Sequence, residues 1–244
     1  MTTGREFMQK TQYKYLETSA QQRGEAQPPL ELPYDATQRP VELPAPTALD
    51  VGPVNLRELI EQRRTARNYV AQPLSPEELS YLLWCTQGIQ EQRDSYATMR
   101  TVPSAGARHA FETYLLINNV EGLDPGVYRY LASAHQLIRM HLGEDLDRRI
   151  TRACLNQEHV ARSAVTFIWV AVVERMAWRY DERGYRYLHL DAGHVCQNLY
   201  LAAEVMRCGV CAIGAFDDVA FNDILELDGE ELFVIYAATV GKRR

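Results

Sequence analysis

Residues 165–173 read Val-Thr-Phe-Ile-Trp-Val-Ala-Val-Val, and this run decides the class of fold. An unbroken series of β-branched, aromatic and apolar residues is typical of a central strand that is buried on both faces. A similar run at residues 232–240 lies near the carboxyl terminus. We expect the two runs to pair as neighbours in one sheet.

Further strands and helices are predicted around this core. Residues 111–118 resemble a strand, and residues 127–141 are predicted to form a hairpin that turns near Ser133. Helices are predicted at residues 144–155 and 218–227. Residues 191–207 carry small and apolar side chains at the spacing of a core or interface helix, with Cys208-Gly209 as its stop.

Two helix starts come earlier in the chain. Asn55 and Glu58 have the spacing of a capping pair. Ser75-Pro76-Glu77-Glu78 combines a cap, a first-turn proline and a capping-box glutamate, and predicts a helix that ends near Gly88. Residues 90–100 are predicted to form a polar loop.

Residues 1–53 are predicted to be an extended arm. They contain prolines at positions 28, 29, 33, 40, 44, 46 and 53, which prevent a long helix. Aromatic and leucine side chains along the arm give it enough apolar surface to lie against the body of the protein or against a partner subunit. The alternative is a flexible tail.

Composition limits the classes of function. The chain has 244 residues, 46% of them hydrophobic, and a formal net charge of -6, which disfavours a broad nucleic-acid surface. No run approaches the roughly 20 apolar residues of a membrane-spanning helix, and residues 1–10 lack the apolar stretch of a signal peptide, so we expect a cytoplasmic protein. Five cysteines, an odd number, suggest reduced thiols rather than a disulfide framework.

Three segments carry features of a ligand site. Arg63-Arg64-Thr65-Ala66-Arg67 would make a strong anion site if the preceding helix ends there; a solvated basic face is the alternative. Gly241-Lys242-Arg243-Arg244 places positive charge at the end of a core strand, where a phosphate could be held, unless it is a frayed tail. The small residues of the loop at 103–109 (Pro-Ser-Ala-Gly-Ala-Arg-His) would let the backbone approach a flat ring, or form an ordinary tight turn.

A metal site is not expected. Cys208 and Cys211 have the spacing of a redox or zinc pair, but no second pair at metal spacing accompanies them. His194 and Cys196 are two positions apart on a predicted helix and so point to different faces. Buried small side chains explain the cysteines better.

In this order, the three segments resemble the nitroreductase superfamily, and most closely its SagB-type or thiazole-oxidase-like dehydrogenase branch. The resemblance extends through Arg183-Gly184-Tyr185-Arg186-Tyr187, Asp191-Ala192-Gly193-His194 and Gln197-Asn198, and covers residues 55–244. It implies an α+β, nitroreductase-like fold with a mainly antiparallel sheet flanked by helices, at residues 54–244. It also implies a homodimer with FMN in two clefts, each built from both subunits.

The resemblance also implies roles for particular residues. Arg63, Arg64 and Thr65 would bind the phosphate end of FMN, with further charge from Lys242 and Arg244. Arg67 would face the N1 and O2 edge of the ring, where a fixed cation stabilises the negative charge of the reduced flavin. The remaining cofactor contacts would come from Pro103, Ser104, Ala105 and Gly106 along the ring and from Ala212, Ile213 and Gly214 near its other edge.

Candidate acid–base residues are Tyr185 and Tyr187, which could act as the base of azoline-oxidising relatives. A hydrogen-bond network in the core is the alternative for these tyrosines. His109 is a further candidate that we expect to be exposed; a structural histidine that closes the loop is the alternative.

The function that the resemblance implies is hydride transfer at FMN in a ping-pong cycle, from a donor expected to be NAD(P)H to an organic acceptor. Ala107-Arg108-His109-Ala110-Phe111 follows the SagB-type pattern rather than the Asn and Gln-Pro-Trp pattern of simple nitroreductases. A peptide azoline dehydrogenase is therefore an alternative, so the substrate is a small molecule or a peptide. A non-catalytic flavin-binding subunit is a second alternative.

Overall fold

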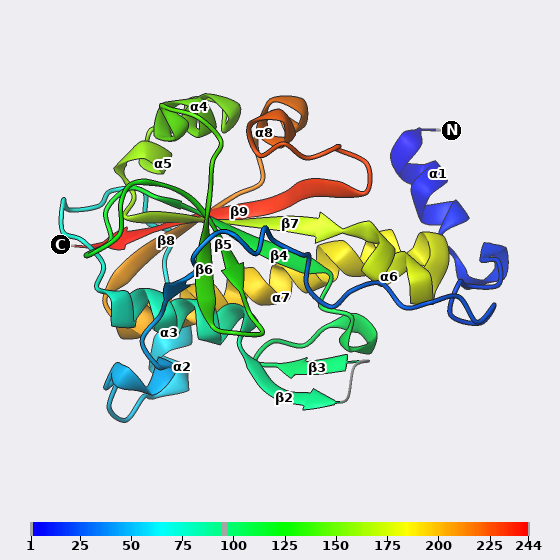
Figure 1. The fold of residues 1–244 in the computed structure, drawn as a ribbon, viewed down its shortest axis with the longest axis horizontal. Coiled ribbons are helices and arrows are strands. Elements are labelled where there is room, and N and C mark those ends of the chain that lie inside the picture. Colours follow the sequence, from blue (N-terminus) through cyan, green and yellow to red (C-terminus); the bar gives the residue numbers. More distant parts are fainter. Residues whose placement is uncertain (1, 94–96, 244) are drawn as a thin grey trace.

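A seven-stranded sheet forms the centre of the molecule (Figure 1). The computed structural model describes residues 2–93 and 97–243. Within them the strand order is β1-β6-β5-β4-β7-β9-β8, and each neighbouring pair is antiparallel. The strands are β1 (Val41–Glu42), β4 (Phe111–Ile117), β5 (Gly126–Leu131), β6 (Gln136–Met140), β7 (Val165–Val172), β8 (Cys208–Ile213) and β9 (Leu232–Lys242).

The central strand lies where its sequence predicts. Strand β7 pairs with β4 on one side and β9 on the other, and all eight of its residues are buried. Its side chains alternate between two cores: Phe167 and Trp169 belong to one, and Ile168 and Val170 to the other. Burial on both faces explains why residues 165–173 contain so little polar character.

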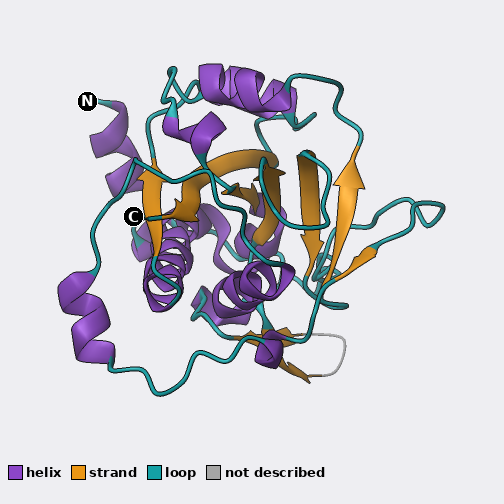
Figure 2. Cartoon of the chain, turned by 90° about the vertical axis from the view of Figure 1, so that its left-hand side faces the viewer, coloured by secondary structure: helices purple, strands orange, loops and turns teal. Residues whose placement is uncertain are grey.

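Helices cover both faces of the sheet, as Figures 1 and 2 show. The first core packs under α3 (Pro76–Gln87), α6 (Val173–Tyr180) and α7 (Gly184–Val205). The second packs under α4 (Leu146–Ala153), α5 (His159–Arg162) and α8 (Asp218–Ile224). The α+β class, with a mainly antiparallel sheet between helices, is therefore confirmed.

Local signals fix the helix ends in the first half of the chain. The Asn55 side chain caps α2 (Leu56–Gln62) by accepting a hydrogen bond of 3.1 Å from the amide of Arg57. Ser75 and Glu78 form the predicted capping box, and α3 ends at Gly88. Because α2 stops at Gln62, the segment from Arg63 is extended and its arginines do not share a helix face.

Two predictions of local structure were wrong. Of the expected loop at residues 90–100, residues 90–93 belong to β2 (Ile89–Arg93) and residues 97–100 to β3 (Ala97–Arg100), which pair antiparallel, and residues 94–96 lie outside the described residues. The polar residues of β2 are exposed, so their polarity did not distinguish a strand from a loop. Helix α7 begins at Gly184, before the expected start at Asp191. The aromatic and charged residues in its first turns gave no apolar stripe by which to recognise it.

The arm packs along the body of the same chain. It opens with α1 (Thr3–Lys10) and η1 (Tyr13–Tyr15), which precede the first proline, and then continues mainly extended. Its backbone is fixed to the body by bonds such as Gln21 N to Trp178 O, 2.8 Å, and by the pairing of β1 with β6. The described residues of the arm therefore do not form the flexible tail that was the alternative.

In the part of the chain that the structure describes, no helix is both long and apolar enough to span a bilayer. All five cysteines lie in that part, and each is a free thiol. Burial raises the pKa of the Cys208 thiol to about 11 and that of Cys196 to about 12, so both are protonated at neutral pH.

Candidate functional site

The segment that follows α2 extends the edge of the sheet. Thr65 forms a parallel bridge with Val210 of β8, and the amide of Ala66 donates a 2.9 Å hydrogen bond to the Val210 carbonyl. A Cβ on Gly209 would lie 2.6 Å from the Ala66 Cβ, so the approach requires glycine at that position. The first basic segment is thus anchored beside the last strands of the fold.

Tyr200 of α7 organises this edge. Its hydroxyl lies 3.2 Å from the Thr65 hydroxyl and accepts a 3.0 Å hydrogen bond from the amide of Ala212. The Arg63 guanidinium lies 5.3 Å from the centre of the Tyr200 ring. Sequence reasoning did not identify Tyr200, although it is an aromatic residue on the helix that was expected at the core or interface.

Arg243 joins the same region. A Cβ on Gly209 would lie 2.9 Å from the Arg243 side chain, whose guanidinium pairs with Glu204 of α7 at 2.7 Å. We call Arg63, Thr65, Tyr200 and Arg243 the basic cluster. A hollow of about 780 Å³ lies next to it, between α2 and the end of α7, with Gln62, Glu204 and Arg243 in its wall.

Lys242 was expected to hold a phosphate, but its side chain pairs with a carboxylate of the protein. Its ammonium forms an ion pair with Glu78 in the first turn of α3, and both side chains are largely buried. Its carbonyl accepts a 3.0 Å hydrogen bond from the amide of Val70. Arg244 lies outside the described residues. Of the two described terminal basic residues, Arg243 is the one whose side chain lies with Ala66 on Gly209, next to Thr65. Sequence reasoning included it in the terminal basic segment but assigned it no role.

Arg67 lies on the other side of the sheet edge. Burial lowers the pKa of His159 on α5, and the charge of Arg67 lowers it further. Burial raises the pKa of Cys211, and the nearby Arg67 guanidinium opposes this shift. Arg67 and Arg162 border a hollow of about 490 Å³. The structure therefore does not bring Arg67 and Lys242 together; Arg64 is exposed and bonds to backbone carbonyls of its own segment.

The loop with Pro103, Ser104, Ala105 and Gly106 docks on α7 at Asp191. The Ser104 hydroxyl donates a 2.6 Å hydrogen bond to the Asp191 carboxylate, and the amide of Ala105 lies 3.2 Å from it. Asp191 is buried, which raises its pKa, while these two hydrogen bonds act to lower it. We call residues 103–107, which include η3 (Ala105–Ala107), the Pro-Ser loop.

Gly106 is required for the shape of the Pro-Ser loop. Its φ of 58° lies in the left-handed region, which favours glycine. A Cβ there would lie 2.5 Å from the Tyr180 hydroxyl and 3.0 Å from the Arg179 side chain. The loop therefore presents backbone against a tyrosine and an arginine that sequence reasoning did not single out.

The basic cluster and the Pro-Ser loop lie at different levels of α7. Tyr200 and Asp191 are separated by about 13 Å along the helix axis at 1.5 Å per residue. Between them the helix exposes Gly193, His194 and Gln197, and Leu190, one residue before Asp191, is also exposed. No atom lies within 4 Å of the place where a Cβ of Gly193 would be. The described residues of the chain leave this face of α7 uncovered.

The three residues at the end of β8 that were expected to contact the ring, Ala212, Ile213 and Gly214, differ in exposure. The amide of Ala212 bonds to Tyr200, Ile213 is buried, and Gly214 is exposed. Of the candidate bases, Tyr187 is half-buried and its hydroxyl bonds to Tyr13 and Arg183. Tyr185 is also half-buried, and burial raises its pKa.

The expectation that His109 is exposed was wrong. Its side chain is 5% exposed, because the residue turns into the core at the start of β4. Burial and the adjacent Arg100 lower its pKa from 6.5 to about 3. His109 is therefore neutral at physiological pH and almost entirely shielded from solvent.

This burial predicts an acid-sensitive fold. The pKa of His109 is lower in the folded state than its ordinary 6.5, so its contribution is present above pH 6.5 and is lost as pH falls toward 3. Between pH 7 and pH 5 the loss is about 2 kcal/mol. Denaturant unfolding at the two pH values should show a smaller loss in His109→Asn, since asparagine tolerates the left-handed backbone of this site.

His141→Asn is the matched control, because His141 is exposed. It should keep the acid sensitivity of the wild type. Equal sensitivity in His109→Asn and the wild type would contradict the assignment.

Within residues 2–93 and 97–243, no three or more His, Cys, Asp or Glu side chains are grouped so as to hold a metal ion. Cys208 and Cys211 lie on opposite faces of β8, since side chains alternate along a strand and three positions separate them.

The chain was compared with known proteins. Residues 60–242 match the model of the nitroreductase family. A protein of Methanocaldococcus jannaschii whose name assigns it to the nitroreductases is 35% identical over 178 residues, which are 73% of this chain and 87% of that protein.

Solved structures agree with this match. A nitroreductase-type protein from Anabaena variabilis is 32% identical, with a TM-score of 0.66 over 78% of this chain; the chain spans 38% of that longer protein. The Escherichia coli microcin synthetase McbBCD complex with a truncated pro-MccB17 bound contains a chain with a TM-score of 0.62 at 18% identity, covering 98% of this chain and 86% of that one. The NADPH:FMN oxidoreductase of Vibrio harveyi, complexed with NAD+, has a TM-score of 0.56 at 16% identity, covering 78% of this chain and 69% of that one. The last two show a shared fold.

Proposed function

The chain belongs to the nitroreductase family, and on that premise we propose that it is an FMN-dependent oxidoreductase that works as a homodimer. Each FMN would lie between the basic cluster of one protomer and the Pro-Ser loop of its partner. The similarity of fold to an NADPH:FMN oxidoreductase supports this choice of cofactor.

One observation carries the two-subunit arrangement. The basic cluster and the Pro-Ser loop are about 13 Å apart along α7, with an uncovered helix face between them. Leu190 on this face is 58% exposed, and the apolar Leu56 and Ile60 of α2 are 61% and 55% exposed. A second copy that covers these apolar residues would bring its own Pro-Ser loop toward the first copy's basic cluster.

The residues of the basic cluster fit a phosphorylated cofactor. Guanidinium groups bind phosphate through paired hydrogen bonds, and the Thr65 hydroxyl adds a neutral donor. Tyr200 holds both Arg63 and Thr65 in place, so little side-chain freedom would be lost on binding. At the other end, the small side chains of the Pro-Ser loop would leave room for the ring, while Gly106 itself lies against the Tyr180 hydroxyl and the Arg179 side chain.

When bound, FMN would supply two-electron hydride chemistry, which no protein side chain provides. In our proposal Arg63, Arg64 and Thr65 bind its phosphate end with Arg243, while Lys242 contributes charge from its pair with Glu78. The resemblance assigns Arg67 to the N1–O2 edge of the ring; because Arg67 lies on the other side of the sheet edge from the basic cluster, its exposed side chain would have to reorient to reach the ring. The Pro-Ser loop and residues 212–214 would shield the two sides of the ring from water.

We expect NAD(P)H as the donor and a small organic molecule as the acceptor. A peptide azoline dehydrogenase is the second candidate. One observation favours it: the match to the peptide-bound microcin synthetase complex spans 98% of this chain, arm included.

The proposal is tested by adding FMN and riboflavin separately to the purified protein. We expect one FMN to bind per chain, and riboflavin to bind at least about 10-fold more weakly because it lacks the phosphate that the basic cluster would hold. Flavin fluorescence quenching measures both affinities. A colourless protein that takes up no FMN would refute the proposal.

Anaerobic stopped-flow mixing of the FMN-loaded protein then separates the candidates. Bleaching of the flavin by NADH or NADPH supports the first candidate. Bleaching by a thiazoline-containing peptide alone supports the second. Retention of FMN with no bleaching by either reagent would identify a non-catalytic flavin-binding subunit.

A further inference from the structure

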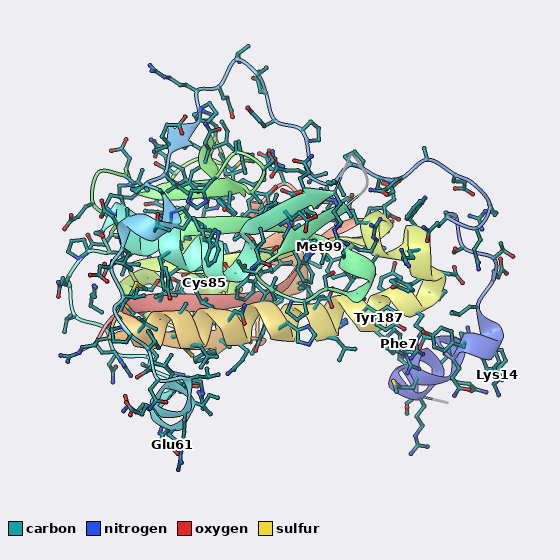
Figure 3. The ribbon with its side chains drawn as sticks, turned by 90° about the horizontal axis from the view of Figure 1, so that it is seen from below. Phe7, Lys14, Glu61, Cys85, Met99 and Tyr187 are labelled. Carbon is teal, nitrogen blue, oxygen red and sulfur yellow. The ribbon has the colours of Figure 1, made fainter. Side chains whose placement is uncertain are left out.

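The arm contains one short sequence twice. Residues 30–34 read Leu-Glu-Leu-Pro-Tyr and residues 41–45 read Val-Glu-Leu-Pro-Ala, so an apolar residue followed by Glu-Leu-Pro occurs at both places. We call residues 31–33 and 42–44 the first and second Glu-Leu-Pro segments. The start of the arm lies at α7, with Phe7 beside Tyr187 (Figure 3), whereas both segments lie along the hairpin of β5 and β6, residues 126–140 (Figure 1).

Both glutamates bond to this hairpin. Ser133, in the turn, donates to the Glu31 carboxylate through its hydroxyl at 2.6 Å and through its amide at 3.1 Å. Gln136, which opens β6, donates a 2.6 Å hydrogen bond from Nε2 to the Glu42 carboxylate. The β5–β6 hairpin thus offers each segment a neutral donor for its carboxylate.

Each proline carbonyl is bound by a buried side chain. Arg129 of β5 donates a 2.9 Å hydrogen bond to the Pro33 carbonyl. The Ser80 hydroxyl of α3 donates one of 2.6 Å to the Pro44 carbonyl. Ser80 is fully buried, and His135 Nε2 lies 2.7 Å from its hydroxyl. Because the Ser80 proton points to Pro44, this histidine nitrogen donates and holds Ser80 in place. The protein therefore recognises both segments by the same two features, the carboxylate and the proline carbonyl.

The two segments are held with unequal strength. The first lies on buried charges, because Glu112 accepts a 2.8 Å hydrogen bond from the Leu32 amide and Arg129 binds the Pro33 carbonyl. Uncovering such charges is costly. The second segment is half-buried or exposed at every residue, and β1 pairs with β6 at only two positions. The second segment is therefore the one that can leave its site.

The edge of β6 is open beyond the second segment. In the part of the chain that the structure describes, residues 138–140 have no strand on the side away from β5. The arm cannot extend the ladder there through Pro40, which has no amide hydrogen. An open strand edge binds extended peptides through their backbone, and side-chain contacts add specificity. A segment without this proline could pair along residues 138–140 as well.

We propose that the outer edge of β6 is a docking site for an extended Glu-Leu-Pro segment of a partner protein, which replaces the second segment of the arm. The glutamate of the partner binds Gln136, and its proline carbonyl binds Ser80. The residues before its glutamate pair with residues 138–140. A second copy of this chain is not the source, because both of its Glu-Leu-Pro segments are docked on its own body. This interaction requires neither FMN nor the proposed activity.

The test is the binding of a fluorescein-labelled peptide, with the sequence of residues 38–46, to the full chain, measured by fluorescence anisotropy. The arm competes for the same site, so the protein variant Glu42→Ala, whose resident segment is weakened, should bind the peptide about 3–10-fold more tightly than the wild type. Glu25→Ala is the matched control, because Glu25 is an exposed glutamate of the arm that pairs with Arg23. It should bind as the wild type does. No binding by Glu42→Ala, or an equal gain in Glu25→Ala, would overturn the proposal.

Two changes in the peptide test what the site recognises. Glu42→Gln in the peptide should weaken its binding to the Glu42→Ala protein by about 3–10-fold, and this difference should vanish when the protein also carries Gln136→Ala. Pro40→Thr in the peptide should tighten binding by about 2-fold or more, because pairing can then continue along residues 138–140. Equal affinities for the Glu and Gln peptides would overturn the carboxylate contact. No gain from Pro40→Thr would overturn the use of the open edge.

Size-exclusion chromatography of the wild type, with and without the peptide, tests the source of the segment. We expect the peptide to leave the oligomeric state unchanged. If the peptide splits a dimer into monomers, the segment bound in trans would be the arm of a second copy, and the assignment to a partner protein would be wrong.

Discussion

Replacing Glu112 with alanine is expected to lower the free energy of unfolding by about 3–5 kcal/mol, the usual cost of leaving buried charge without its partner. Glu112 of β4 is 3% exposed. Its carboxylate accepts hydrogen bonds from Arg175 at 2.6 Å and Arg129 at 3.4 Å, and both arginines are 3% exposed. The loss of Glu112 would leave two buried guanidinium groups without an opposite charge.

The same substitution should release the middle of the arm. Glu112 accepts a 2.8 Å hydrogen bond from the amide of Leu32. Its arginine partners donate to arm carbonyls: Arg175 to Pro29 at 2.7 Å, and Arg129 to Leu32 at 3.0 Å and Pro33 at 2.9 Å. The arm is held here through its backbone atoms, so removal of the Glu112 carboxylate should detach this part of the arm from the body of the protein.

Denaturant unfolding measures the loss of stability, and limited proteolysis followed by mass spectrometry measures release of the arm. Glu61→Ala is the matched control. It breaks the Arg57–Glu61 pair, whose side chains are 84% and 58% exposed, and should cost at most about 0.5 kcal/mol. An equally small cost for Glu112→Ala would contradict the buried-charge account.

The sequence predicts the sheet well because burial leaves a record in side-chain type. Phe167, Ile168 and Trp169 lie between two cores, and no polar residue could replace them cheaply. The capping box at Ser75 and the Asn55 cap of α2 follow from hydrogen bonds between residues a few positions apart. Both partners of such a hydrogen bond lie in one short segment, so the segment alone predicts it.

The sequence predicts partners far less well. Nothing in the spacing of Lys242 indicates that Glu78 of α3 lies close enough to pair with it. The burial of His109 depends on its left-handed backbone and on neighbours such as Arg100, and neither leaves a pattern in its own segment. Tyr200 becomes visible as a site residue only when α7 is placed beside β8. Pairings of this kind are set by tertiary packing.

The basic cluster makes a second large effect expected: Arg63→Ala should weaken FMN binding by about 10–100-fold, since it removes a charge-assisted contact to phosphate. Arg57→Ala is the matched control, because Arg57 lies on the adjacent helix α2, is exposed, and carries the same charge. It should change the affinity by less than about 2-fold. Equal affinities for the two variants would contradict the assignment of Arg63 to the phosphate.

The two-subunit arrangement can be tested by pairing two defective chains. Gly106→Val should also weaken FMN binding, because its side chain would displace Tyr180 and reshape the Pro-Ser loop. Ala105→Glu serves as a second loop variant if Gly106→Val does not fold. Each variant alone has two damaged sites per dimer.

In a mixed dimer of Arg63→Ala with a loop variant, the two lesions would fall in the same site if each site uses the basic cluster of one protomer and the Pro-Ser loop of the other. The second site would then be wild type throughout. Differently tagged chains, co-expressed and purified through both tags, should therefore bind about one FMN per dimer with wild-type affinity. If each site were built from one chain, both sites would stay damaged and no tight binding would return.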